Sequence, residues 1–252
     1  MTPQHSDRVR RSFSRSFDSY HAAADQQVWV ADRLVTALRD AGAPTQFHRA
    51  FEFGCGTGHL TRALTEAYGF DQLTLNDLTP DARATAKAHG ASFLPGDVET
   101  LAWPAGMELV ASASTIQWLN DPMRVLRAAA EELAPGGWLA VSGFGPDQYR
   151  ELAQLGSKAA APGLCAVEAL AEAVSEHLEV MAMGEARRLQ LFPTPVDVLR
   201  HLRRTGVNAR AQGAWSKSRL ARFSTDYIRA FGTEEGVPLT YHPVWIVARK
   251  RG

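Results

Sequence analysis

Residues 50–60 have the sequence Ala50-Phe51-Glu52-Phe53-Gly54-Cys55-Gly56-Thr57-Gly58-His59-Leu60. Apolar side chains flank an acidic one, glycines follow at every second position, and apolar residues at helical spacing come next, which is typical of a strand, a tight turn and a helix. Glycine suits such a turn because it adopts backbone angles that other residues resist and lets a ligand approach bare main chain. The stretch predicts a nucleotide-type loop in an α/β sheet.

The glycine spacing distinguishes between ligands. A dinucleotide fold has the pattern G-x-G-x-x-G, whereas here the third glycine, Gly58, comes one position early and His59 takes its place. Glu52 suits a phosphate poorly, but a carboxylate at the end of a strand attracts an ammonium or sulfonium charge. The acid followed by G-x-G-x-G resembles the first motif of class I methyltransferases, which implies S-adenosylmethionine. A glycine turn without any ligand is the alternative.

Composition favours one compact domain. The chain has 252 residues, of which 45% are hydrophobic and 21% charged, enough for an ample core with a lid or insertion. We expect a single methyltransferase domain with four parts: N-terminal helices or lid in 1–45, a cofactor-binding core in 46–145, a substrate lid with the last sheet elements in 146–235, and a terminal strand in 236–252.

Charge and cysteine content exclude several classes. The 27 basic residues are matched by 27 acidic ones, which argues against a nucleic-acid partner and favours a protein or small-molecule substrate. Cys55 and Cys165 are the only cysteines and have no metal or redox spacing, so we expect neither a disulfide nor a metal site. Without an apolar segment in Met1–Arg15 or a long apolar run elsewhere, we expect a cytoplasmic protein with no membrane contact.

After the loop, strand-like and helical patterns alternate. This alternation predicts a right-handed, doubly wound, mostly parallel sheet. The expected strands are 72–78, 91–98, 107–111 and 138–141, with helices in 80–89 and 123–133. Beyond Gly143 we expect helices in 149–160, 167–177 and 194–231, strands in 178–183 and 188–192, and a terminal strand in 238–248.

Three positions after predicted strands carry candidate site residues. Asp77 ends a strand about 20 residues past the loop, where a carboxylate accepts both ribose hydroxyls; it could instead be an acid at a helix N-terminus. Asp97 could accept from an adenine amino group, or be a plain turn residue. Gln117 and Trp118 follow the fourth strand, and ligands lie beyond the carboxyl ends of such strands. Trp118 could equally be a core residue.

The two ends of the chain add further candidates. Phe13, Tyr20 and Gln27 lie in an amphipathic helical segment that could fold over the cofactor, although an aromatic stripe is also typical of a core. Residues 200–222 carry many basic side chains and few acids, which indicates either a docking surface or a solvated helix face. These side chains are Arg200, His201, Arg203, Arg204, Arg210, Lys217, Arg219 and Arg222.

With these motifs in order, the whole chain resembles the malonyl-acyl-carrier-protein O-methyltransferase family of biotin synthesis. The resemblance beyond the generic cofactor half lies in Phe13-Ser14-Arg15 with Tyr20 and Gln27, Ser112 through Asp121, Phe144-Gly145 with Glu151-Leu152, Gly206-Val207-Asn208-Ala209 with Gly213, and Pro238-Leu239-Thr240-Tyr241-His242. The alanine-rich segment 159–172 does not match residue by residue, so the resemblance leaves the shape of the lid open.

The resemblance implies a seven-stranded sheet and methyl esterification of the free carboxylate of malonyl-acyl-carrier protein, with S-adenosylhomocysteine as the by-product. Carrier proteins are acidic, so the basic 200–222 segment is the candidate docking surface. An ion pair would reduce the nucleophilicity of the carboxylate oxygen that attacks the methyl group. We therefore expect neutral hydrogen-bond donors near that oxygen, and the candidate catalytic residues are Tyr20, Gln117, Trp118, Tyr241 and His242. The expected cofactor-binding residues are Phe13, Tyr20, Gln27, Glu52, Gly54, Cys55, Gly56, Gly58, Asn76, Asp77, Leu78, Gly96, Asp97, Val98, Ser112, Ala113 and Gln117.

Two other functions remain open at this stage. A methyltransferase acting on another small acid or a quinone precursor would share the cofactor half, and would act without a carrier. A non-catalytic cofactor-binding or regulatory protein would show a broken loop or a missing acid, and neither occurs here. A nicotinamide oxidoreductase is disfavoured by the glycine spacing.

Overall fold

The structure is a computed structural model and describes residues 25–157, 161–204 and 216–252. Two of the expected cofactor-binding residues, Phe13 and Tyr20, lie outside the described residues, as do the family-like segment 206–209 and Gly213. In the described part of the chain, no helix is long and apolar enough to cross a membrane.

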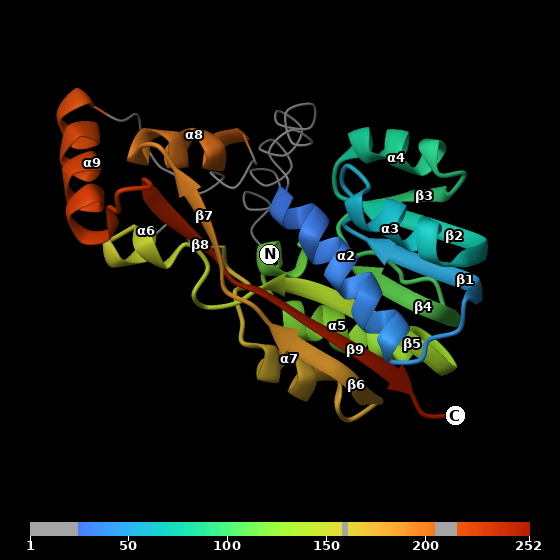
Figure 1. Cartoon of the computed structure of the whole chain (residues 1–252). Coiled ribbons are helices and arrows are strands. Elements are labelled where there is room, and N and C mark those ends of the chain that lie inside the picture. The colour runs from blue at the N-terminus through green and yellow to red at the C-terminus, as the bar shows by residue number, and fades with distance from the viewer. Residues whose placement is uncertain (1–24, 158–160, 205–215) are drawn as a thin grey trace.

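A seven-stranded sheet forms the larger lobe, on the right in Figure 1. Its strand order is β3-β2-β1-β4-β5-β9-β6, and β9 runs in the direction opposite to the other six strands. The predicted doubly wound, mostly parallel, seven-stranded sheet is therefore confirmed. The strands are β1 (Gln46–Phe53), β2 (Gly69–Asp77), β3 (Ser92–Pro95), β4 (Met107–Ser112), β5 (Leu133–Phe144), β6 (Leu178–Glu185) and β9 (Pro243–Lys250).

Helices cover both faces of this sheet because successive strand residues point to opposite sides. On β1, Ala50 packs with the helices α2 and α3, whereas the next residue, Phe51, packs in a second core with α5 and α7. These helices and the short α4 are α2 (Asp25–Asp40), α3 (His59–Ala67), α4 (Arg83–Ala88), α5 (Pro122–Glu132) and α7 (Val167–Val174).

A smaller lobe, on the left in Figure 1, has its own hydrophobic core around Tyr227, Leu239 and Tyr241. In the described residues it combines an antiparallel pair of strands with three helices, and its strand β7 matches the strand expected in 188–192. Its elements are β7 (Arg188–Phe192), β8 (Val237–Tyr241), α6 (Arg150–Gln154), α8 (Pro195–Arg204) and α9 (Lys217–Phe231).

The predicted terminal strand is in fact two strands. β8 pairs with β7 in the smaller lobe, and β9 pairs with β5 and β6 in the large sheet. The change occurs at His242, whose N–H donates to the Gln148 side chain and whose carbonyl accepts from Gly145 N–H, so neither group joins a strand ladder. Together, β6-β9 and β7-β8 form one long ribbon that joins the two lobes (Figure 1).

Some boundaries differ from the prediction for local reasons. β5 begins at Leu133 rather than near residue 138, because Leu133 pairs with Met107 across a bulge and the strand runs through Pro135 and Gly136. The helix expected in 149–160 is described only over Arg150–Gln154. The expected strand 91–98 is limited to Ser92–Pro95, because only these residues pair with β2.

Candidate active site

A pocket lies at the carboxyl ends of β1, β2, β3 and β4. The chain moves outward from β1 in one direction through β2 and β3, and then crosses to β4 and β5 on the other side. Crevices at such a switch point are the usual ligand sites of doubly wound sheets. The lining residues are Gln27, Glu52, Gly54, Cys55, Gly56, Thr57, His59, Leu60, Asn76, Asp77, Leu78, Thr79, Gly96, Asp97, Val98, Glu99, Ala113, Ser114, Thr115, Trp118, Leu119 and Asn120.

Two glycines of the loop are required for different reasons. Gly54 has φ +67°, and a Cβ atom there would lie 2.2 Å from Thr115 Oγ1, so the loops after β1 and β4 could not meet. Thr115 Oγ1 donates to the Gly54 carbonyl at 3.2 Å, which joins these loops. Gly56 has φ +49°, and a Cβ atom there would meet nothing within 4 Å, so its left-handed backbone is the reason for glycine.

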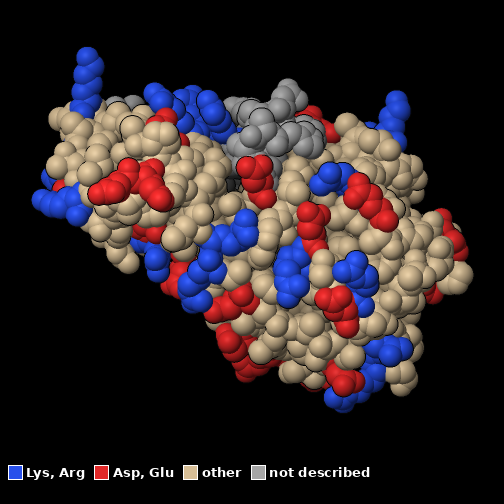
Figure 2. Space-filling view, in the orientation of Figure 1, with Lys and Arg blue, Asp and Glu red and all other residues tan. Residues whose placement is uncertain are grey.

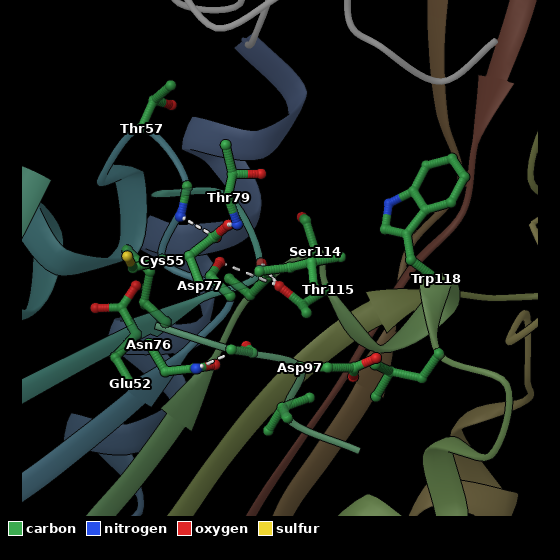
Figure 3. Close-up of a pocket in the computed structure, with 18 of the residues that line it drawn as sticks. Glu52, Cys55, Thr57, Asn76, Asp77, Thr79, Asp97, Ser114, Thr115 and Trp118 are labelled. Carbon is green, nitrogen blue, oxygen red and sulfur yellow. Dashed lines mark hydrogen bonds between the residues drawn. The ribbon is translucent and has the colours of Figure 1, made fainter. Parts of the chain in front are cut away.

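Asp77 stands at the end of β2 and organises the loop. Its Oδ2 accepts from Gly56 N–H at 2.9 Å and its Oδ1 from Thr79 N–H at 2.7 Å (Figure 3). Burial raises its pKa, and the two backbone donors oppose that shift. Each carboxylate oxygen can accept a second hydrogen bond, so Asp77 keeps the capacity to accept from ligand hydroxyls.

Glu52 lies beneath the loop and is 1% exposed. Its Oε2 accepts from Thr61 Oγ1 at 2.8 Å. Burial raises its pKa to about 8, against a lowering by the Thr61 hydrogen bond, and the nearby Asp77 raises it further. Among the described residues the lining includes four acids (Glu52, Asp77, Asp97 and Glu99) and no lysine or arginine. The pocket therefore favours a positively charged ligand.

Two polar side chains near β3, Asn76 and Glu99, connect the segments that form the pocket walls. Asn76 Nδ2 donates to the carbonyls of Leu94 and Gly96, which joins the ends of β2 and β3. Glu99 accepts from the backbone N–H groups of Asn120 and Asp121 and from Asn120 Nδ2. The β3 exit and the loop after β4 are thereby held together across the pocket.

The loop after β4 brings Ser114 and Trp118 to the pocket. Ser114 has φ +55°, a left-handed backbone that is rare for a residue with a side chain. In Figure 3, Ser114 lies between Asp77 on one side and Trp118 on the other. Gln117 does not line the pocket: its Nε2 donates to the Ser114 carbonyl at 2.6 Å.

Helix α2 contributes Gln27 from its first turn. This helix is held against the ribbon by stacked side chains: Arg188 lies 4.2 Å from the Trp29 ring centre, and Trp29 packs edge-on against Trp245. Arg188 Nε also donates to Gln26 Oε1 at 2.8 Å. The ribbon thus determines where Gln27 enters the pocket.

Most of the predicted cofactor-binding residues that the structure describes come together in this pocket. Those that line it are Gln27, Glu52, Gly54, Cys55, Gly56, Asn76, Asp77, Leu78, Gly96, Asp97, Val98 and Ala113, together with the predicted catalytic residue Trp118. Gly58, Ser112 and Gln117 are not among the lining residues. Ser112 instead donates to the Phe53 carbonyl and ties β4 to β1.

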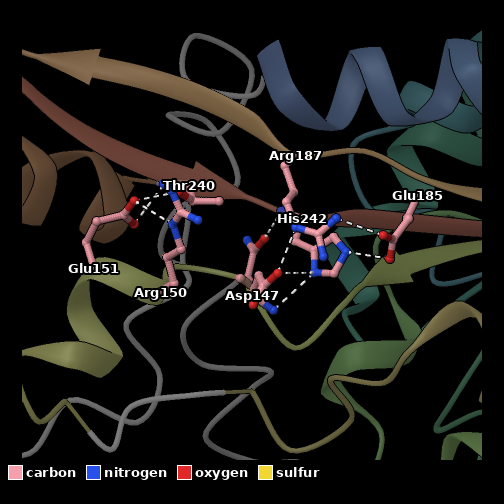
Figure 4. Close-up of polar contacts among 8 residues, drawn as sticks. Asp147, Arg150, Glu151, Glu185, Arg187, Thr240 and His242 are labelled. Carbon is pink, nitrogen blue, oxygen red and sulfur yellow. Dashed lines mark hydrogen bonds and ion pairs between the residues drawn. The ribbon is translucent and has the colours of Figure 1, made fainter.

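Tyr241 and His242, predicted near the reacting oxygen, also lie outside the pocket lining. The Tyr241 hydroxyl contacts His201 Nε2 in the core of the smaller lobe. His242 Nδ1 accepts from Asp147 N–H at 3.0 Å and its Nε2 lies 2.9 Å from Glu185 (Figure 4). The structure gives them packing partners at the base of the smaller lobe, because the strand that carries them changes sheets there.

Several lining residues were not predicted from the sequence. They include three threonines, one serine, and the hydrogen-bonded pair formed by Glu99 and Asn120. The threonines and the serine are Thr57, Thr79, Thr115 and Ser114. Two of the threonines could have been predicted from their position in the sequence, because Thr57 lies inside the glycine loop and Thr79 lies two residues after Asp77. Ser114 could not have been predicted in this way, because the residue type serine does not indicate a left-handed backbone conformation.

S-adenosylmethionine fits these residues. Buried polar atoms of the lining that have no hydrogen-bond partner among the described residues include Gln27 Oε1, Thr57 Oγ1 and Ser114 Oγ. A buried unpaired polar atom is costly, so a polar ligand is expected to complete them. The acidic lining suits a sulfonium and an ammonium group, and Asp77 suits a ribose.

Comparisons with known proteins identify the family to which the chain is similar. Residues 51–141 match the family model described as a methyltransferase domain. The malonyl-acyl-carrier-protein O-methyltransferase of Chlorobium luteolum is 36% identical over 252 residues, covering 96% of this chain and 95% of the relative. That of Prosthecochloris aestuarii is 37% identical over 251 residues, with 96% and 92% covered.

A solved structure extends the agreement to the fold. The N-methyltransferase NodS of Bradyrhizobium japonicum, in complex with S-adenosyl-L-homocysteine, superposes with a TM-score of 0.59 at 14% identity, covering 97% of this chain and 99% of that one. At this identity the similarity concerns the fold alone. The sequence relatives are closer and span nearly the whole chain, and the chain therefore belongs to the malonyl-acyl-carrier-protein O-methyltransferase family.

Proposed function

We propose that the protein transfers a methyl group from S-adenosylmethionine to the free carboxylate of malonyl-acyl-carrier protein, giving the methyl ester that primes pimelate synthesis for biotin. The observation that carries the proposal is identity of 36% and 37% to two named members, over 96% of the chain. The acidic pocket at the β1–β4 switch point supports the donor half independently, because it combines ribose-type and cation-type contacts.

Bound in this pocket, the donor would supply a methyl group on a positively charged sulfur; one oxygen–carbon bond forms as the carbon–sulfur bond breaks, and its electron pair stays on sulfur. Asp77 is proposed to hold the ribose hydroxyls. Glu52, whose raised pKa keeps it largely protonated at neutral pH, is proposed to release its proton when the donor binds and so to offset the positive charge. Gly96, Asp97 and Val98 are proposed to frame the adenine.

The acceptor needs orientation and a dry site more than acid–base help, since a carboxylate is already ionised at pH 7. Aligning two reactants can supply roughly 7–11 kcal/mol of a barrier. The absence of lysine and arginine from the lining among the described residues supports a reactive, unpaired carboxylate. Trp118 remains the proposed pocket residue on the acceptor side.

For the carrier protein we propose docking on α8 and α9, which flank the smaller lobe. Residues 195–231 contain eight Lys and Arg but only two acids, Asp197 and Asp226. Asp197 pairs with Arg200, and Asp226 with Arg229. Arg203 and Arg204, at the end of α8, are exposed. Figure 2 shows Lys and Arg side chains gathered along the edge of this lobe over α8. An acidic carrier protein would complement that charge.

The test is methyl transfer from labelled S-adenosylmethionine to three acceptors: malonyl-acyl-carrier protein, malonyl-coenzyme A and free malonate. We expect base-labile label on the carrier protein at a higher kcat/KM than on malonyl-coenzyme A, and little label on malonate. Equal use of free malonate, or label on none of the three, would contradict the proposal. Unloaded carrier protein is the control for methylation elsewhere on that protein.

A further inference from the structure

Ser114 has an unusual backbone at the centre of the pocket. Among the described residues only Ser114 and Tyr149 have positive φ without being glycine, at +55° and +56°. Residues held in such conformations persist only where their surroundings enforce them, and they concentrate at functional sites. Tyr149 packs edge-on against Tyr241 in the smaller lobe, whereas Ser114 lines the pocket.

The backbone of Ser114 is held at both ends. Its N–H donates to the Ser142 carbonyl on β5 at 3.1 Å. Its carbonyl accepts from Gln117 Nε2 at 2.6 Å. The next residue, Thr115, is anchored to Gly54. These contacts direct the Ser114 side chain without using its hydroxyl.

The Ser114 hydroxyl itself has no partner among the described residues, although its oxygen is buried. The neighbouring polar groups are already engaged: Thr115 Oγ1 with the carbonyls of Gly54 and Ala113, and Asn120 Nδ2 with Glu99. Thr57 Oγ1 is also unpaired, but it lies on the glycine loop beside Gly56, on the donor side.

A negatively charged acceptor needs a hydrogen-bond donor in a pocket that four acids line without lysine or arginine. A neutral hydroxyl can orient a carboxylate and leave its nucleophilicity largely intact, whereas a cation would reduce it. The Ser114 hydroxyl, two residues beyond the end of β4, has no partner in the described part of the chain and can donate in this way.

We propose that Ser114 Oγ–H donates to the oxygen of the acceptor carboxylate that does not react, and so orients the other oxygen toward the methyl group. The inference rests on the proposed function and names the acceptor contact of that site. No proton is transferred: Ser114 keeps its hydrogen while the oxygen–carbon bond forms and the carbon–sulfur bond breaks. Gln117 is then a positioning residue that acts through the Ser114 carbonyl.

The test compares Ser114→Gly and Ser114→Ala with Ser142→Ala in the full-length protein. Both Ser114 variants lose the hydroxyl, but only glycine accepts the left-handed backbone without strain, so their agreement isolates the hydroxyl. Ser142→Ala is the matched control. The Ser142 hydroxyl is also buried without a partner among the described residues and does not line the pocket, and the substitution keeps the backbone carbonyl that accepts from Ser114 N–H.

We expect kcat/KM for malonyl-acyl-carrier protein to fall about 10- to 100-fold in both Ser114 variants, as for loss of a hydrogen bond to a charged group. Calorimetric affinity for S-adenosylhomocysteine should stay unchanged, and Ser142→Ala should match the wild type. Unchanged kcat/KM in Ser114→Gly, or donor affinity that falls by the same factor, would overturn the inference. A wild type that does not esterify malonyl-acyl-carrier protein would overturn the proposed function itself; active wild type and active Ser114 variants would overturn only the role of Ser114.

Discussion

At the residue scale, Asp77 has two tasks that only a carboxylate can combine. Its two oxygens receive N–H groups of Gly56 and Thr79, which holds the glycine loop closed against β2. The remaining lone pairs are available to a ligand. An amide of the same size would present an NH₂ group to one backbone N–H, so the loop and the ligand contact would be lost together.

Asp77→Asn should weaken binding of S-adenosylhomocysteine about 10- to 100-fold, because hydrogen bonds to a charged group are replaced. Isothermal calorimetry measures the dissociation constant directly. Asp71→Asn is the control: it changes the same strand, but its carboxylate is exposed and contacts Gln46 and His48 at the surface. Equal affinities for the Asp77 and Asp71 variants would remove Asp77 from the donor site.

The raised pKa of Glu52 predicts that the stability of the protein depends on pH. Its pKa is about 8 in the folded protein, above its ordinary value of 4.5. Between these values the folded state binds a proton that the unfolded state has released, so the free energy of unfolding falls as pH rises through this window. Glu52→Gln abolishes that titration, and the variant should gain stability relative to wild type from pH 5 to 8, on the order of a few kcal/mol.

Urea denaturation of both proteins at pH 5, 6.5 and 8 tests this expectation. Glu66→Gln, at an exposed position of α3, controls for removal of a carboxylate, and its profile should run parallel to that of the wild type. If the Glu52→Gln profile is parallel as well, Glu52 is ionised throughout and the pocket is wetter than its burial indicates.

At the element scale, the long ribbon is the connection between the lobes. Four side chains meet where β6-β9 gives way to β7-β8: Arg187 donates to Asp147 and Glu185, and His242 contacts Glu185 and the Asp147 backbone (Figure 4). The hydrogen bonds that Arg187 donates, together with its charge, lower the pKa values of Asp147 and Glu185 from their ordinary values. A Cβ atom on Gly145 would lie 2.6 Å from the His242 ring, so the loop after β5 packs directly on this junction.

His242→Ala should therefore destabilise the protein by about 2 kcal/mol and lower its melting temperature by about 4–8 °C. The reason is that His242 is 2% exposed. Its removal leaves the Asp147 N–H without its acceptor and Glu185 with Arg187 as its remaining partner. Calorimetric melting measures the change, and donor affinity should be unaffected. His48→Ala, whose side chain is 72% exposed beside Asp71, should change stability by under about 0.5 kcal/mol. Wild-type stability combined with lost turnover in His242→Ala would instead assign His242 to the reaction.

At the scale of the whole molecule, the donor pocket belongs to the larger lobe and the excess of positive charge on α8 and α9 to the smaller one. A carrier protein delivers its substrate on a long flexible arm, so docking and chemistry can occupy different lobes. The charge of the docking surface is then expected to change the rate of association with the carrier protein but not the rate of methyl transfer.

Arg203→Glu/Arg204→Glu should raise KM for malonyl-acyl-carrier protein more than for malonyl-coenzyme A, because only the carrier presents an acidic protein surface. Steady-state kinetics with both acceptors at low and high salt measures the difference, and salt should reduce it. Arg39→Glu/Lys87→Glu makes the same change of net charge on α2 and α4 and should have little effect on either KM. Equal effects of the two double variants on both acceptors would show that the α8 charges are merely solvated.

Prediction from the sequence succeeded where chemistry is local. The glycine loop, the acid that ends β2 and the alternation of strands and helices are patterns within short windows, and the pocket gathers Glu52, Gly54 and Asp77 as expected. It failed where a position depends on distant partners. Tyr241 and His242 lie within one apolar stretch. Pro243 interrupts the strand ladder there, but the stretch does not indicate that its two parts join different sheets.

The sequence by itself determined the doubly wound sheet and the kind of ligand its loop accepts, because backbone angles, side-chain periodicity and the charge of single residues are local properties. Only the tertiary structure decided three further points. Gln117 donates to the Ser114 carbonyl, Ser114 lines the pocket, and the C-terminal stretch joins the two lobes. These outcomes depend on contacts between segments far apart in the chain, which the packing of the whole molecule brings together.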